Sequence, residues 1–365
     1  MQKKPYVLIS FALMVFISER VFSYQLMHTS GGVPMRKKIL AASLAVSLGL
    51  GLVSQASAAE KMILYTSMKE SLIGAIYEKF KVKHPDVTID YQSAGAGKLM
   101  AKIATERQAG KVLADVLWTS EVPDFYNLKK EGMLETYVPA QFGEVINPFP
   151  DHDGSFTAAR LGTLGIVYNT QLVKKAPAEW DDVLKPEFNG AYGIANPALS
   201  GTAYMSISLL VKQFGWEYIE KLAANKAKIG KGSGQVVDDT ASGELAGCIG
   251  VDYITIDKIK KGAKLAYVFP KEILIAPSPV AIIKGTPNLS AAKKFVDFLL
   301  TKEAQEVIAS EGTLSVRNDV KVAPELPIAS AEEAVKRSIK VDYKSLEDEK
   351  QTTIKKFTDI LQGKK

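Results

Sequence analysis

Short apolar runs alternate with stretches of helical spacing from about residue 60 onward. Residues 62–65, 87–91 and 114–118 predict three buried strands, and residues 71–83 and 99–109 have the spacing of helices between them. Only short polar turns separate these segments. Such an order of strands and helices is typical of an α/β unit with a mostly parallel sheet.

The same alternation returns in the second half of the chain. Residues 192–195 and 248–251 predict further strands, and a helix with apolar spacing follows residue 200. The apolar runs 165–169 and 273–283 lie between the two halves. We expect these two runs to cross from one half of the molecule to the other.

The prediction is therefore an α/β protein of two lobes, with two mixed sheets flanked by helices and a hinge of two strands. Residues 59–165 and 280–365 are assigned to lobe 1, and residues 166–279 to lobe 2. The tail, residues 330–365, has a helical pattern and many charges, and no chemistry is visible in it.

Residues 1–58 have the features of a segment that precedes the mature protein. Residues 35–38 are positively charged, residues 39–53 are apolar, and residues 56–58 match the small-residue pattern of a signal-peptide cleavage site. We expect translation to start at Met35, with the residues before it an extension of the reading frame, and cleavage after Ala58. The alternative is an uncleaved N-terminal anchor.

Composition excludes some functions and leaves others open. The chain has 46 Lys and Arg against 40 Asp and Glu, with no dense basic run among aromatic residues, so nucleic-acid binding has little support. The single cysteine, Cys248, cannot form an internal disulfide, and its apolar neighbours predict a buried thiol. We interpret residues 151–153, Asp-His-Asp, as a solvated turn because a metal site needs several converging ligands.

The most informative stretch is residues 196–202, a loop that opens directly into a helix. Ser200 is a suitable N-cap, Gly201 lets a ligand approach the backbone, and Thr202 adds a second hydroxyl. The first amides of a helix lack partners and carry partial positive charge, which suits phosphate, phosphonate or carboxylate. The alternative is an ordinary capped helix.

Residues 93–98 form a second loop of small residues that opens a helix. Gln92 and Leu99 exclude a nucleotide P-loop, and Met100 excludes a dinucleotide fingerprint. Ligands of α/β sheets bind beyond the carboxyl ends of strands, so the residues that follow the strands are the candidate ligand-binding residues. They are Thr66, Ser67, Ser93, Gly95, Gly97, Ser120 and Glu121 in lobe 1, and Ser200, Gly201, Thr202, Ser233, Asp252 and Tyr253 in lobe 2.

From residue 61 to about residue 320 the chain resembles the periplasmic solute-binding proteins of ATP-binding-cassette importers, in particular the binders of ferric ion, phosphonates and sugar phosphates. The resemblance rests on the order and spacing of residues 93–97, 114–116, 200–202, 243–245 and 293–299. It implies a type II-like two-lobed fold that closes over one ligand. It also implies delivery of this ligand to a membrane permease with its ATPase. Because no cysteine lies near the cleavage site, we expect a soluble periplasmic protein without a lipid anchor, and we expect it to be a monomer.

The resemblance leaves two kinds of ligand open. In ferric-ion binders, the helix start that corresponds to Ser200 and Gly201 holds an anion beside the iron. The positions of the family's iron ligands are taken here by Met68 or Lys69, by Ser120 with Glu121 one place off, and by Asp252 and Tyr253. Ferric iron prefers several anionic oxygens, so the sequence favours a phosphonate or a phosphorylated small molecule, with Fe³⁺ as the alternative and no cofactor otherwise.

We expect the ligand's negative charge at the two loops and Asp252 orienting an amine or hydroxyl at its other end. Tyr65, Trp118 and Tyr253 are candidates to stack on the ligand, with core packing favoured for Trp118. The chain has no Gly-x-Ser-x-Gly or His-Glu-x-x-His motif, and only His84 and His152 follow the cleavage site. We therefore predict a binding protein, and no enzyme.

Overall fold

The computed structural model describes residues 59–148 and 153–364. These residues belong to one compact unit. The predicted signal sequence, its cleavage site, and Asp151 and His152 of the predicted turn lie outside the described residues.

The predicted strands and helices are present, and most of their ends differ from the prediction by a few residues. The exception is the first crossing strand, predicted over residues 165–169, which begins at Thr157. The strands are β1 (Glu60–Thr66), β2 (Val87–Ser93), β3 (Val116–Trp118), β4 (Thr157–Asn169), β5 (Tyr192–Ala195), β6 (Lys228–Gly230), β7 (Gly247–Val251), β8 (Leu265–Val268) and β9 (Leu274–Ile282). The helices are α3 (Glu70–Lys83), α4 (Ala96–Gln108), α5 (Val122–Lys130), α6 (Gly201–Phe214), α7 (Trp216–Ala224), α8 (Ser233–Ser242), α9 (Asp252–Lys260), α10 (Leu289–Leu299), α11 (Lys302–Ser310), α12 (Ala331–Arg337) and α13 (Ser345–Leu361).

Two elements escaped the sequence analysis. The short strand β6 is only three residues long and half exposed, so it carries almost no apolar signal. Helix α9 begins at Asp252, where the sequence predicted only the end of a strand. Its pattern is hard to detect because charged and apolar residues are mixed around it.

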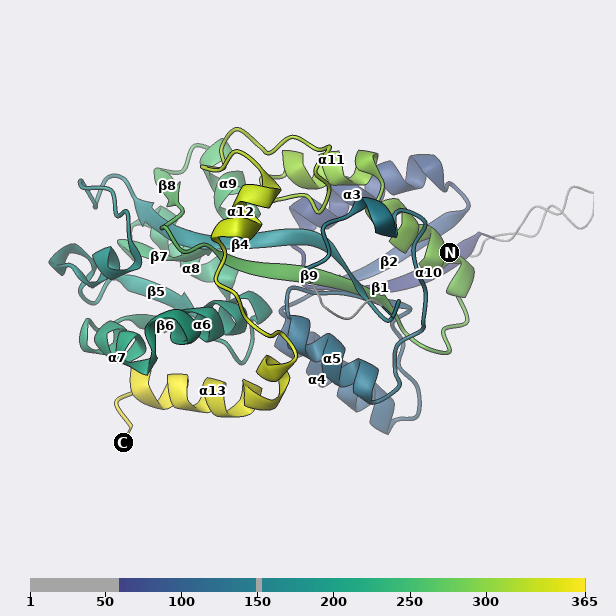
Figure 1. Cartoon of the computed structure of the whole chain (residues 1–365), viewed down its shortest axis with the longest axis horizontal. Helices are drawn as coiled ribbons and strands as arrows, with labels where there is room; N and C mark the ends of the chain where they lie inside the picture. Colours follow the sequence, from purple (N-terminus) through teal and green to yellow (C-terminus); the bar gives the residue numbers. More distant parts are fainter. Residues whose placement is uncertain (1–58, 149–152, 365) are drawn as a thin grey trace, which may run out of the picture. The chain divides into compact units, whose positions relative to one another are not determined.

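Within the described residues, the strands form a nine-stranded sheet in the order β2-β1-β3-β9-β4-β7-β5-β6, with β8 paired to β4. The parallel strands β1, β2 and β3 form one half, which we call lobe 1, and β5, β6 and β7 form the other, which we call lobe 2. The two predicted sheets are therefore continuous through β4 and β9, the antiparallel pair between them (Figure 1).

Strands β4 and β9 run from one lobe into the other. The first part of β4 pairs with β9, and its last part pairs with β7 and β8. The predicted lobe boundaries, at residues 165/166 and 279/280, fall inside these two strands. The assignment of residues to lobes remains a prediction, because a boundary inside a shared strand divides a continuous ladder.

Helices cover both lobes. In lobe 1, α3, α10 and α11 pack against one another, while α4 packs on β1 and α5 on β9. In lobe 2, α8 packs on β5 and β7, and α6 packs on α7. The apolar residues between these layers form the core, in which Trp118 and Cys248 are fully buried as predicted, and burial raises the pKa of the Cys248 thiol to about 12.

The C-terminal tail is helical, as predicted, and its last helix contacts both lobes. Helix α13 lies against α5, α6 and α7, and the ammonium group of Lys350 meets two buried carboxylates. The sequence gives no sign of this contact, because the partners of Lys350 are more than two hundred residues away in the chain.

Candidate functional site

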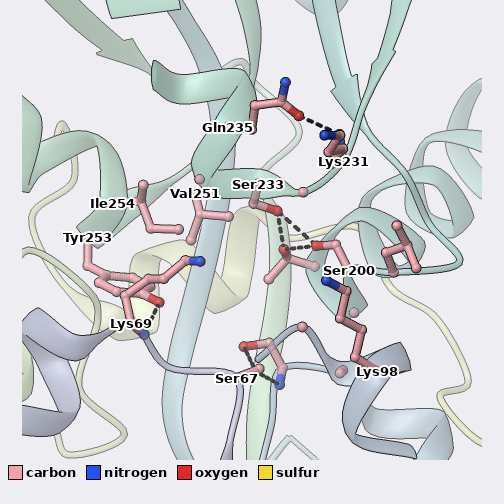
Figure 2. A pocket seen from close by; sticks show the side chains of 18 of the residues that line it. Ser67, Lys69, Lys98, Ser200, Lys231, Ser233, Gln235, Val251, Tyr253 and Ile254 are labelled. Carbon is pink, nitrogen blue, oxygen red and sulfur yellow. Dashed lines mark hydrogen bonds between the residues drawn. The ribbon is translucent and has the colours of Figure 1, made fainter. Parts of the chain in front are cut away.

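A cavity of about 250 Å³ lies where loops from both lobes meet (Figure 2). Its walls follow the carboxyl ends of β1, β3, β5 and β7, which is where ligands bind in sheets of this kind. It is lined by Ser67, Lys69, Gly95, Ala96, Lys98 and Ser120 from lobe 1, by Arg160 of β4, and by residues 199–202, 231–235, 251, 253 and 254 from lobe 2.

Within the described chain, five helices begin at this cavity: α3, α4, α6, α8 and α9. Their N-cap residues, which all line it, are Lys69, Gly95, Ser200, Gly232 and Val251. Only the Ser200 side chain accepts a hydrogen bond from its own helix, at 3.4 Å from the amide of Ala203. The remaining first-turn amides and the aligned helix dipoles make the cavity a region of positive potential.

Glycines allow the two predicted loops to approach each other closely. A Cβ added to Gly95 would lie 2.2 Å from the carbonyl oxygen of Leu199, and one added to Gly97 would lie 2.2 Å from that of Ala198. A Cβ on Gly201 would lie 2.6 Å from the Cβ of Glu121. The lobes therefore touch on one side of the cavity, and a larger residue at any of these positions would push them apart.

Three hydroxyl groups of lobe 2 meet at the cavity wall (Figure 2). The Oγ of Ser233 lies 2.9 Å from that of Ser200 and 2.8 Å from the Oγ1 of Thr202, and the last two are 3.1 Å apart. Hydroxyl groups can rotate to donate to a bound ligand. This cluster and the nearby amides of α6 and α8 thus present several hydrogen-bond donors to one point.

Three lysines bring positive charge to the same cavity. Lys69, Lys98 and Lys231 all line it and are exposed, and none makes an ion pair with a residue that the structure describes. Lys69 comes from lobe 1 and reaches lobe 2, where its Nζ would lie 3.5 Å from a Cβ on Gly234. No Asp or Glu is among the described residues that line the cavity, so this charge is available to an anionic ligand.

The floor of the cavity contains Arg160, which is fully buried. Its Nη1 lies 3.3 Å from Asp252 Oδ1, and its Nε donates to the hydroxyl of Ser278 on β9 at 3.0 Å. It also donates to Thr313 at 2.9 Å and, more weakly, to Ser120 at 3.3 Å. Arg160 thereby joins residues from both lobes at the crossing strands.

Tyr253 lies beside Arg160, whose guanidinium group is 4.8 Å from the centre of the tyrosine ring. The Tyr253 hydroxyl accepts a hydrogen bond from the backbone amide of Lys69 at 3.0 Å, across the interface between the lobes. Burial raises the pKa of Tyr253, and Arg160 only partly offsets this, so the phenol is neutral at physiological pH. Tyr253 forms part of the cavity wall, and its stacking on a ligand stays a prediction.

The structure brings together eight of the predicted residues as lining of the cavity: Ser67, Gly95, Ser120, Ser200, Gly201, Thr202, Ser233 and Tyr253. The other five, Thr66, Ser93, Gly97, Glu121 and Asp252, lie behind it. Tyr65 also lies away from the cavity, where its hydroxyl donates to Glu106 at 2.6 Å.

The five residues outside the cavity support its walls. Thr66 accepts from the amide of Met68, and Ser93 donates to the Met68 carbonyl at 2.6 Å, so both shape the turn that follows β1. Asp252 is fully buried, and its carboxylate accepts from Thr163, Thr313 and the amide of Tyr253 as well as from Arg160. It is thus fully occupied and does not face a ligand.

Sequence reasoning missed Arg160, Lys231 and Gln235 as lining residues. It placed the loop of residues 93–98 at this edge of the sheet but did not name Lys98 among the candidate ligand-binding residues. A signal for Arg160 existed, because it is the single charged residue between Ser155 and Ile166 in an otherwise uncharged strand. A charge in such a strand requires a buried partner or a functional role. Lysines 98 and 231 had no comparable signal, since exposed lysines are common everywhere.

Two further properties bear on what the site can hold. No group of three or more His, Cys, Asp or Glu placed to bind a metal ion occurs within the described ranges. Residues 59–148 and 153–364 also contain no helix that is long and apolar enough to cross a membrane.

Two α/β lobes joined by crossing strands, with a cavity between their loops, define the architecture of a periplasmic binding protein. The structure of the periplasmic binding protein AfuA from Actinobacillus pleuropneumoniae, with fructose-6-phosphate bound, has a TM-score of 0.74 and 26% identity, and covers 83% of this chain and 98% of that one. Iron-bound HitA from Pseudomonas aeruginosa shares the fold, with a TM-score of 0.68, 20% identity, and coverage of 82% and 99%.

Sequence comparison agrees with this architecture. The model of the bacterial extracellular solute-binding protein family matches residues 65–306, and the chain belongs to this family. A putative 2-aminoethylphosphonate-binding periplasmic protein from Salmonella typhimurium is 26% identical over 250 residues, which are 65% of this chain and 72% of that protein. The protein is thus an extracellular solute-binding protein of an ABC importer, which binds a small ligand and delivers it to a permease.

Proposed function

We propose that this protein captures a small organic phosphate or phosphonate in the cavity between its lobes and delivers it to an ABC permease. The observation that carries the proposal is the electrostatic character of the cavity. Five helix N-termini and three lysines without ion pairs face a space that no carboxylate lines among the described residues. A ligand with two negative charges on one group matches this arrangement.

The cavity favours an uncharged, hydroxyl-bearing remainder over an amine. An ammonium group requires a carboxylate or several acceptors, and Asp252, the residue expected to orient it, is already occupied by Arg160 and two threonines. Gln235, Ser67 and Ser120 offer neutral polar groups on the remaining wall. A phosphorylated hydroxy compound is therefore a better match than an aminophosphonate.

Ferric iron is the alternative ligand, and the donor set gives it little support. Iron needs several anionic oxygens, whereas the cavity offers one neutral tyrosine, Tyr253, beside Arg160 and Lys69. The positive charges would repel the cation unless an anion came with it.

The proposal further includes a monomeric periplasmic protein, without catalytic activity, whose permease works with an ATPase.

Titration calorimetry of the purified protein tests the proposed ligand. The panel consists of inorganic phosphate, fructose 6-phosphate, 2-aminoethylphosphonate and ferric iron. We expect fructose 6-phosphate to bind more tightly than 2-aminoethylphosphonate, because the amine has no partner in the cavity. Tightest binding of ferric iron, or an aminophosphonate that binds as well as the sugar phosphate, would contradict the proposal.

Variants of the hydroxyl cluster test where the anion binds. Ser200→Ala with Thr202→Ala is expected to weaken the binding of the preferred phosphate at least about tenfold, since hydrogen bonds to charged groups are each worth about 1.5–3 kcal/mol. Ser233→Ala separates this effect from helix capping, because the N-cap of α8 is Gly232. Thr105→Ala with Thr352→Ala, two exposed hydroxyls on other helices, is the control. Unchanged affinity in the cluster variants would show that the anion binds somewhere other than at these hydroxyl groups.

A further inference from the structure

Helix α13 lies across both lobes. Its contacts are with α5 of lobe 1 and with α6 and α7 of lobe 2. In Figure 1 it runs beneath α7 and α6, and its N-terminal end reaches α5. A rotation of one lobe away from the other must therefore separate α13 from at least one of them.

Lys350 is the centre of this contact. Its Nζ lies 2.5 Å from Glu121 Oε1 and 2.5 Å from Asp124 Oδ1, and both carboxylates are almost fully buried. The same ammonium group lies 5.8 Å from the ring centre of Tyr204. Glu121 and Asp124 belong to lobe 1, whereas Tyr204 is on α6 of lobe 2, so one side chain holds both lobes.

Other contacts fasten α13 to lobe 2. The Tyr204 hydroxyl donates to the carbonyl of Leu346, and the Nζ of Lys356 lies 4.5 Å from the ring centre of Trp216. Phe357 is fully buried. We expect the helix to stay with lobe 2 when the lobes separate. Opening then breaks its contacts with α5, among them the ion pairs of Lys350 with Glu121 and Asp124 and a longer one, 3.9 Å, between Glu347 and Lys130.

This contact lies directly behind the ligand cavity. Glu121 follows Ser120, which lines the cavity, and its side chain fills the space where a Cβ on Gly201 would lie. Tyr204 is one turn after Gly201 on the same helix. Movement at Gly201 when a ligand binds or leaves is thus transmitted over one helical turn to the partners of Lys350.

We propose that α13 favours the closed arrangement of the lobes before any ligand binds. We call this helix the clasp, and the contact of Lys350 with Glu121 and Asp124 the lock, because it joins the helix to lobe 1. Breaking the lock leaves the buried carboxyl groups of Glu121 and Asp124 without the cation that they contact, and this disfavours the open arrangement. The ligand then needs to supply less free energy to keep the lobes closed. The proposal rests on the two-lobed fold and is independent of the identity of the ligand.

Distance measurements between spin labels on the two lobes, in the absence of ligand, test the clasp. Ala104→Cys on α4 and Lys212→Cys on α6 place labels at exposed positions, and the native Cys248 is fully buried and escapes labelling. Against this background, Lys350→Met is expected to lower the ratio of closed to open molecules about tenfold or more. The control is Lys355→Met, an exposed lysine whose ion pair, among residues 59–148 and 153–364, is with Asp359 of its own helix.

A second pair of variants keeps the test decisive if Lys350→Met fails to fold. Trp216→Ala removes the ring under Lys356 and leaves the buried carboxylates paired, and we expect α13 to loosen from lobe 2 and the open population to rise. Lys350→Met combined with Glu121→Gln and Asp124→Asn removes the buried charge and should restore folding while the lobes remain open. Folded variants with the distance distribution of the native protein would overturn the clasp, whatever the ligand panel shows.

Discussion

Arg160 shows how a single buried charge organises the centre of this molecule. Its guanidinium group and the Asp252 carboxylate are both fully buried. Arg160 donates hydrogen bonds to Ser278 and Thr313, and Asp252 accepts them from its neighbours. Burial of either charge alone would be unfavourable by several kcal/mol, whereas the hydrogen-bonded pair is tolerated. The pair therefore holds the crossing strands, α9 and the cavity floor in one arrangement.

Removal of Arg160 is expected to destabilise the protein strongly. Arg160→Met leaves Asp252 without its cation, and the free energy of unfolding in urea should fall by about 3–5 kcal/mol. Arg160→Met with Asp252→Asn should recover part of this loss, because no uncompensated charge remains. If the double variant is as unstable as the single one, the loss comes from packing and the ion pair is not its cause.

Glu121 predicts a pH dependence of stability. Burial, and then repulsion from Asp124, raise the pKa of Glu121 to about 8, from an ordinary value of 4.5. Burial also raises the pKa of Asp124. For Lys350, burial lowers the pKa, but the two acidic neighbours outweigh burial, so that its pKa is raised overall. The native state therefore retains a proton that the unfolded chain has lost, and this part of the stability falls as the pH rises from about 4.5 to about 8.

Unfolding curves of the native protein and Glu121→Gln at several pH values measure this effect. Between about pH 5 and about pH 8.5, the unfolding free energy of the native protein should fall by about 1–3 kcal/mol relative to that of Glu121→Gln, which cannot titrate at this position. Parallel pH profiles would show that Glu121 titrates normally.

At the scale of elements, the site is made by the starts of helices. Side chains contribute hydroxyls and lysines, but the positions of the first-turn amides of α4, α6 and α8 depend on how closely the backbones approach. That approach depends on glycine at positions 95, 97 and 201. The geometry of these loops thus depends on the absence of a Cβ at the three glycines as much as on the side chains that are present.

Gly201→Ala tests this point. The added Cβ would lie 2.6 Å from the Cβ of Glu121 and 3.0 Å from that of Ala96, so α6 or the loop after β3 must shift. We expect at least about tenfold weaker binding of the preferred phosphate, because the first-turn amides move away from the anion. Gly74→Ala in α3, where nothing lies within 4 Å, is the control and should stabilise the protein by about 0.5–1 kcal/mol. Equal affinity of both variants would argue against a contact between anion and amides.

At the scale of the whole molecule, the two lobes are in contact at three places. The crossing strands β4 and β9 form a permanent connection, the ligand cavity closes on one side of them, and α13 reaches across on another. In this arrangement the ligand and α13 both favour closure. A binding protein with two contributions of this kind can be partly closed while empty, which is the state that the spin-label experiment measures.

Much of this architecture could be predicted from the sequence. The alternating apolar runs identify nearly every strand and helix, because burial on a sheet requires that pattern locally. The loops at residues 93–98 and 196–202 could be predicted as helix starts that line a cavity, since glycine and an N-cap residue next to a helix start are local signals. By contrast, β6 and α9 were missed because neither has a clear apolar period.

The sequence alone determined the fold class, the order of elements, and the two helix starts that meet at the cavity, because each of these depends on residues that are close together in the chain. Only the tertiary structure decided that Asp252 faces Arg160 and that Lys350 meets Glu121 and Asp124. These pairs join residues that are about a hundred or more positions apart, and their energies depend on burial, which no local pattern specifies.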